Sequence, residues 1–173
     1  MGTTLFFPRG LVAAGQPTDL LWPIVGGSVL WPAYRKEQAH INDGEGPAFD
    51  LGNQLGLTIV APWDGVIIQS ASDPHTNDGA FHAGNVVILQ CVYKTVTYRF
   101  HFCHQRELWR PQWVALKKGD TIGYVGRTGT GLSPTGELEQ MTEGNAHLHL
   151  WCEEQRADGS WMRIWPSKLF EGV

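Results

Sequence analysis

The sequence predicts an all-β fold, a compact antiparallel β-sheet assembly with long polar loops. Its 21 glycines and 10 prolines interrupt the 173 residues at short intervals, as turns between short strands do. The segments between them are rich in β-branched and aromatic residues, without the 3.6-residue period of a long amphipathic helix. We therefore expect strands at residues 57–62, 65–72, 85–92, 95–104, 120–126 and 146–154, and a short helix within 166–172.

Composition excludes several classes of protein. Hydrophobic residues make up 42% of the chain and charged residues 17%, which favours a packed core over disorder. The net charge is −4 and no basic run exceeds two residues, so nucleic acid is not an expected partner. The three cysteines form no CxxC pair, which argues against a disulfide framework. No transmembrane segment and no secretory signal are expected from the sequence.

The domain organisation is simple. Residues 1–20 are expected to form an N-terminal arm, and residues 21–173 a single domain. Two long polar, glycine-rich loops are expected at 72–84 and 127–145. Loops of this length in a small β domain are frequently functional, and the second leads directly into a pair of histidines.

That pair, in "AHLHLW", is the first candidate for chemistry. Side chains alternate along a strand, so His147 and His149 share one face while Leu148 and Leu150 take the other. One imidazole can then bind a metal while its neighbour faces a substrate. The alternative is a half-exposed pair of histidines at a sheet edge.

A second candidate lies in the segment "TVTYRFHFCHQ". Strict alternation places His104 on one face, with Phe100 and Phe102, at the point where the strand ends. The opposite face carries His101 and Cys103, so His101 and His104 are not expected in one site. We interpret His101 and Cys103 as ordinary packing, with metal binding as the alternative.

Asp50 is the third candidate, because it stands in the apolar context "AFDL". A carboxylate in such a place is costly unless it is paired or binds a cation. His40 precedes it across a glycine-rich stretch that allows the chain to fold back. The set His40, Asp50 and His149 fits a zinc site with three protein ligands and one open position.

The ordered motifs over about residues 20–170 resemble the M23 peptidases, lysostaphin-like zinc enzymes that cut peptides of the bacterial cell wall. The resembling segments are "LLWPIVGG", "FDLGNQLGLTIVAPWDGVI", "GNVVILQ", "YRFHFCHQ", "VALKKGDTIGYVGRTG", "NAHLHLWCEE" and "RIWPSKLF". The resemblance implies a lysostaphin-like sheet of the duplicated-hybrid-motif type with long active-site loops. Carried over, it makes Asp50 and His149 zinc ligands and His104 and His147 catalytic residues.

One position departs from the commonest form of that family. There a ligand histidine stands four residues before the aspartate, where this chain has Gly46. Related forms place the histidine farther upstream, and His40 fits that arrangement as the remaining metal ligand. If His40 is not a ligand, the site lacks one. The alternative function is therefore a catalytically inactive relative that serves as a structural or binding component of a virion or cell envelope.

The expected function is zinc-dependent hydrolysis of peptidoglycan peptide cross-links, as a phage tail or lysis component. Its partners are then peptidoglycan peptide and other virion tail proteins, and it acts in the virion or in the extracellular or periplasmic space. A lipoyl-type carrier is a further alternative, since "VALKKGDTIGYVG" resembles half of that barrel. The lysines Lys117 and Lys118 precede the turn glycine rather than occupy a hairpin tip, which argues against it.

Overall fold

The computed structural model describes residues 20–25, 46–52, 54–73, 82–132, 138–140 and 146–170. The expected N-terminal arm lies outside these ranges except for Leu20, which is fully buried in the core. His40 also lies outside the described residues, as do parts of both long loops.

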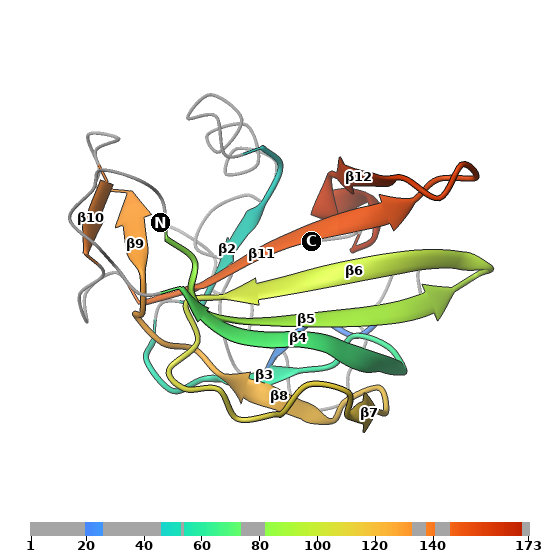
Figure 1. The fold of residues 1–173 in the computed structure, drawn as a ribbon. Coiled ribbons are helices and arrows are strands. Elements are labelled where there is room, and N and C mark those ends of the chain that lie inside the picture. The colour runs from blue at the N-terminus through green and yellow to red at the C-terminus, as the bar shows by residue number, and fades with distance from the viewer. Residues whose placement is uncertain are drawn as a thin grey trace, which may run out of the picture.

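A seven-stranded antiparallel sheet forms the centre of the molecule (Figure 1). Its main path runs β12–β11–β6–β5–β4–β7, and β2 pairs with β11 off this path. β2 and β12 pair with successive parts of one edge of β11, whose other edge pairs with β6. The strands are β2 (Phe49–Leu51), β4 (Gly65–Asp73), β5 (Gly84–Tyr93), β6 (Val96–Cys103), β7 (Ala115–Leu116), β11 (Leu148–Gln155) and β12 (Trp161–Ile164).

Two smaller antiparallel sheets complete the described fold. β1 (Ile24–Val25), β3 (Thr58–Val60) and β8 (Thr121–Tyr124) form one of them. β9 (Thr130–Leu132) and β10 (Leu138–Gln140) form the other, inside the expected loop 127–145. The expected short helix is the 3-10 helix η2 (Pro166–Lys168). Within the described ranges there is no α-helix, which confirms the all-β prediction. None of the described helices is long and apolar enough to cross a membrane.

The β5–β6 hairpin carries the strand that leads to His104. Its two strands pair from Tyr93↔Val96 back to Val87↔Phe102. The two turn residues, Lys94 and Thr95, have positive φ angles of 47° and 71°. Such angles at both central positions characterise the type I′ turn, whose twist matches that of antiparallel strands. The turn therefore fixes the register that delivers the end of β6 to the site.

The hydrophobic core lies between the seven-stranded sheet and the three-stranded sheet (Figure 1). Fully buried side chains come from both, and they include Ile59, Ile122, Val87, Leu89, Phe100, Phe102, Leu148 and Leu150. The opposite face of the large sheet holds a smaller cluster formed by Val86, Ile88 and Cys103 with Trp151 packed against it. All three cysteines are buried and none is in a disulfide, as expected. One face of the sheet thus builds the core, and the other is available for the site.

Candidate metal centre

β11 positions the histidine pair in the way that strand alternation predicts. Leu148 and Leu150 are fully buried in the main core. His149 lies between them in sequence, so its side chain projects from the opposite face. His147 and His149 both approach the same carboxylate oxygen. The predicted shared face is therefore confirmed.

β2 brings Asp50 to this pair from far away in the sequence. In the β2–β11 ladder Asp50 lies directly opposite His149. Its flanking residues Phe49 and Leu51 are buried in the core, and Asp50 itself is only 5% exposed. Asp50 Oδ1 lies 3.2 Å from His149 Nδ1 and 3.3 Å from His147 Nε2. The buried carboxylate therefore has the imidazole partners that its apolar context requires.

His104 completes the cluster, but not in the way that alternation predicts. His149 lies opposite Cys103 in the β6–β11 ladder, so the site face is the Cys103 face and not the Phe102 face. The prediction that His104 shares a face with Phe102 is wrong. β6 ends at Cys103, and His104 takes a left-handed conformation with φ of 59°. This conformation ends the period-two alternation and turns the ring onto the site.

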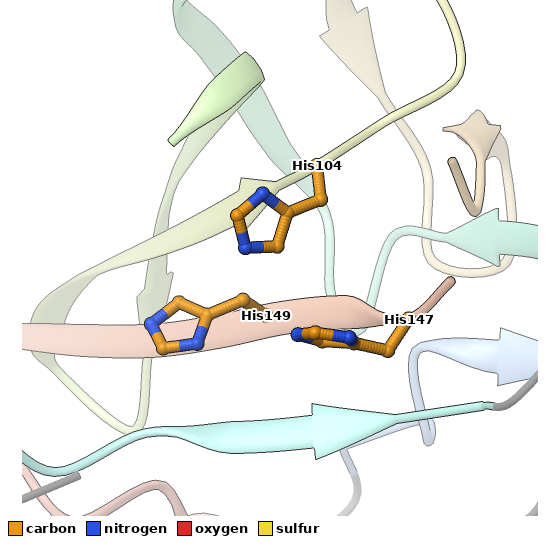
Figure 2. A group of neighbouring side chains, drawn as sticks. All are labelled: His104, His147 and His149. Carbon is orange, nitrogen blue, oxygen red and sulfur yellow. The ribbon is translucent and has the colours of Figure 1, made fainter. Parts of the chain in front are cut away.

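Figure 2 shows the His104 ring directed toward the rings of His147 and His149. The ring centroids lie 5.2 Å and 5.8 Å away, respectively, and both pairs are edge-on. One nitrogen from each of the three histidines falls within 4.8 Å of the others. Three segments far apart in sequence thus converge on one point: β2, the end of β6 and the start of β11.

The environment of His104 keeps its imidazole neutral. The ring is buried, and this burial lowers the pKa of His104 well below its usual range, helped by the nearby His147 and His149. Its Nδ1 lies 2.8 Å from the carbonyl oxygen of Thr128. A carbonyl oxygen can only accept, so Nδ1 carries the hydrogen and Nε2 carries the lone pair. His104 is therefore set up to accept a proton or a cation at Nε2.

His101 lies on the site face of the sheet but belongs to a different cluster. Its ring stacks on Trp151 at a centroid distance of 3.4 Å, and Nε2 donates to Glu153 Oε2 at 3.0 Å. Burial, with lesser contributions from Arg163 and Arg99, lowers the pKa of His101 to about 3. The contact with Glu153 is thus a hydrogen bond of a neutral imidazole. The interpretation of His101 as packing agrees with this geometry.

The donors around Asp50 fit a zinc ion. Two donors of a tetrahedral zinc site, each about 2.0–2.2 Å from the metal, lie about 3.3–3.6 Å apart. Asp50 Oδ1 and His149 Nδ1, at 3.2 Å, match that spacing closely. His147 Nε2 lies at nearly the same distance from Asp50 Oδ1, but its side chain is 13% exposed against 3% for His149. His147 is thus the histidine of the pair that is more open to an incoming substrate.

The backbone at Gly46, the position where the commonest form of the M23 family has its ligand histidine, is unfavourable for a side chain. Its φ is +79°, a conformation that side chains rarely adopt. A Cβ placed there would lie 3.2 Å from Cδ and Nε of Arg163, whose Nε donates to the Pro47 carbonyl. A histidine at position 46 would therefore be strained and would press on a fixed arginine.

Comparison with models of protein families gives no match, and comparison with curated proteins gives none either. Solved structures do match. A structure from Pseudomonas aeruginosa assigned to peptidase M23 has 18% identity and a TM-score of 0.57, and the match covers 96% of this chain and 55% of that one. LytU matches at 18% identity with a TM-score of 0.50, covering 87% of this chain and 83% of that one. The catalytic domain of lysostaphin from Staphylococcus simulans matches at 20% identity, a TM-score of 0.48 and coverages of 71% and 77%.

The chain therefore has the fold of the M23, lysostaphin-like domains, as the sequence motifs predict. It spans only 55% of the Pseudomonas aeruginosa protein. The structure also brings together residues that the sequence motifs single out from distant parts of the chain. Asp50, His104, His147 and His149, singled out from sequence motifs, all meet on one face of the large sheet.

Thr128 is the residue of this site that the sequence does not reveal. It lies in the segment "GRTGTG", at the start of the long loop expected at 127–145. Its contact with His104 is made by a main-chain carbonyl, and a carbonyl has no signature in the sequence. The only available hint was the pair of glycines around it.

Proposed function

We propose that this protein is a zinc-dependent endopeptidase that hydrolyses peptide cross-links of bacterial peptidoglycan. One observation carries the proposal: a buried aspartate and three histidines from three segments meet on one face of an M23-like sheet. Buried carboxylates and imidazoles are costly to gather unless they pair with one another, bind a cation or take part in chemistry. The resemblance of the sequence motifs supplies the substrate class.

In this proposal Asp50 and His149 hold the metal, together with His40. Zinc bound there would lower the pKa of a water molecule and polarise a peptide carbonyl. Asp50 is acceptor-only when ionised, and its Oδ1 lies 3.3 Å from His147 Nε2 and 3.2 Å from His149 Nδ1. It therefore supplies the negative charge that offsets a divalent cation in a buried place.

In the proposed reaction His104 acts as the proton acceptor and His147 stabilises the negative charge that develops on the substrate. The His104 hydrogen is committed to the Thr128 carbonyl, so His104 accepts a proton from the attacking water at Nε2. His147 is the most exposed imidazole of the group, so it faces the substrate and stabilises the developing oxyanion. Cys103 plays no part as a nucleophile, since it is buried in the small cluster on the sheet.

The rival function is a non-catalytic relative that binds or scaffolds in a virion or cell envelope. Gly46 favours this rival, because the commonest ligand position of the family is filled by a residue without a side chain. The two functions differ in metal content, since a scaffold needs no ion at Asp50. Zinc bound in stoichiometric amount argues for the peptidase.

The setting follows from the substrate. Peptidoglycan lies outside the cytoplasmic membrane, so the protein acts in the extracellular or periplasmic space or from a virion. Association with other phage tail proteins stays a prediction from the sequence alone. Mass spectrometry of purified particles tests it, because a virion component is found there and a host enzyme is not.

The activity is tested on isolated cell walls, by counting the new amino termini released. We expect release by the zinc-loaded protein, loss of release with a chelator and recovery when zinc is restored. His147→Ala should abolish release while zinc remains bound. His101→Gln serves as the control, because it alters a buried histidine of the same sheet face that lies outside the cluster. Full activity of His147→Ala, or no release by zinc-loaded protein, contradicts the proposal.

A further inference from the structure

Thr128 makes three hydrogen bonds that all bear on the placement of His104. Its carbonyl oxygen accepts from His104 Nδ1 at 2.8 Å. Its hydroxyl accepts from the Asn85 main-chain N–H at 2.8 Å and donates to the Gln105 carbonyl at 2.9 Å. The hydroxyl thus joins Thr128 both to the start of β5 and to the residue that follows His104.

We propose that Thr128 is a positioning residue for His104: its hydroxyl fixes the main-chain carbonyl that orients the imidazole and sets its tautomer. This inference rests on the proposed function for the importance of His104, but the geometry is independent of it. The catalytic group would be His104, and Thr128 acts only through it. The turn "GRTG" thereby gains a role that its sequence does not suggest.

Close packing of the main chain around Thr128 restricts the position of its carbonyl. Gly84 and Gly129 both have positive φ, of 67° and 84°. A Cβ on Gly84 would lie 2.4 Å from Thr128 C, O and Oγ1, and one on Gly129 would lie 2.1 Å from the His82 carbonyl oxygen. Only glycine permits the two segments to approach so closely. The Thr128 turn and the start of β5 therefore pack main chain against main chain.

The main chain around His104 is held by hydrogen bonds at the start of β5. The His104 N–H donates to the Ala83 carbonyl at 2.8 Å, and the Gln105 N–H donates to the Asn85 carbonyl at 3.1 Å. The Asn85 side chain donates to the Gln105 carbonyl at 3.1 Å. The backbone of His104 and the Thr128 carbonyl that holds its ring thus both contact residues 83–85, at the start of β5. Such an arrangement suits a residue held in a left-handed conformation, which needs surrounding structure to maintain it.

The hydroxyl is the part of Thr128 that mutation can remove. It acts as donor and acceptor at once, so serine can replace it and valine cannot. Thr128→Val keeps the shape and the β-branching while leaving the Asn85 N–H and the Gln105 carbonyl without this partner. The carbonyl is then free to shift, and the His104 hydrogen is no longer confined to Nδ1.

The direct readout is the tautomer of His104, followed by the ¹⁵N signals of its ring in the metal-free protein. The His104 signals are assigned from the spectrum of a His104→Gln variant. Wild type and Thr128→Ser should show the Nδ1–H form, and Thr128→Val should show a mixture or the Nε2–H form. Thr97→Val is the matched control, since it makes the same change near the far end of β6. It should leave the His104 signals unchanged.

The kinetic readout is turnover on cell walls. Loss of a partner that orients a metal-binding histidine typically costs about 10–100-fold in metal affinity or activity. We expect a loss of about the same size for the oriented His104, so Thr128→Val should lower kcat by about that factor with KM and zinc content unchanged. Thr128→Ser should restore most of it. Thr128→Ala, which adds no methyl group in place of the hydroxyl, replaces Thr128→Val if the latter folds poorly.

A pure Nδ1–H signal in both Thr128→Val and Thr128→Ala overturns the inference. So does a loss of kcat that Thr128→Ser shares. A wild-type protein without peptidase activity contradicts the proposed function instead, and the tautomer measurement still decides the role of Thr128. The two failures are thus separable in one set of proteins.

Discussion

Gly84→Ala gives the sharpest perturbation of the site that replaces none of its functional side chains. The added Cβ would lie 2.4 Å from three atoms of Thr128. Contacts under 3.0 Å are essentially never seen, and ordinary contact begins at 3.4 Å. The Thr128 main chain must therefore move by about 0.6–1.0 Å, because it is backbone and cannot rotate away.

The displacement of Thr128 should lower both the turnover and the stability of the protein. A shift of about 0.6–1.0 Å away from His104 stretches the 2.8 Å contact between His104 and the Thr128 carbonyl to about 3.4–3.8 Å, at or beyond the limit of a hydrogen bond. Misplacing a catalytic group by that amount costs about 100-fold in turnover. For stability, the left-handed alanine costs about 1–2 kcal/mol, and the crowding adds about 1–3 kcal/mol.

The matched control is Gly159→Ala. Gly159 has φ of +84°, yet a Cβ there meets nothing within 4 Å. Gly159→Ala therefore introduces the backbone strain without a steric clash. The difference in stability and turnover between the two variants then measures the effect of crowding Thr128. The assays are urea unfolding for stability and wall hydrolysis for turnover. Equal stability and equal turnover in the two variants would refute the reasoning.

The remaining predictions concern the metal ligands and the buried histidine of the sheet. His149→Ala should lose zinc, because it removes the nitrogen 3.2 Å from Asp50 Oδ1, whereas His147→Ala should retain it; metal analysis of both proteins checks this. His40→Ala should also lose zinc, and zinc retained at wild-type affinity contradicts its role as a ligand. For His101, burial lowers the pKa to about 3 from a usual value of 6.5, so the unfolded chain binds the proton more readily. Its contribution to stability is full above pH 6.5 and is lost as the pH falls toward 3. His101→Gln should flatten the pH dependence of the free energy of unfolding in that window, and an unchanged slope contradicts the assignment.

Strand prediction succeeded where β-branched residues run for several positions. The six expected strands correspond to β3, β4, β5, β6, β8 and β11. The strands β1, β2, β7, β9, β10 and β12 were not predicted, and β2 shows why. It has three residues, all of them buried, so it has no alternating pattern, and it becomes a strand only because β11 offers an edge to pair with.

The site was predictable to the extent that its chemistry lies in side chains. Asp50 stood out because a carboxylate in an apolar run needs a partner, and the structure supplies His149 directly opposite. The histidine pair stood out through its spacing. The orientation of His104 was predicted wrongly, since alternation assumes that the strand continues and the φ of 59° ends it. Positive φ is enriched at histidine among the non-glycine residues but stays uncommon there, so the sequence signal is too weak to predict it at His104.

The role of Thr128 was inaccessible from the sequence for a different reason. Its contact with His104 depends on the meeting of the 126–129 turn with the start of β5, which are about forty residues apart in sequence. Glycines at positions 84 and 129 are necessary for that approach. Glycine is common in turns of every kind, so its presence alone did not indicate a close contact.

The central claim is that Asp50 and His149 bind a zinc ion beside His104 and His147. Anomalous diffraction at the zinc edge from crystals of the metal-loaded protein tests it most directly. The account predicts one peak per chain, about 2.0–2.2 Å from Asp50 Oδ1 and His149 Nδ1, with His40 as a further ligand. A zinc-loaded crystal with no peak at this position, or with its only peak elsewhere on the protein, contradicts the account.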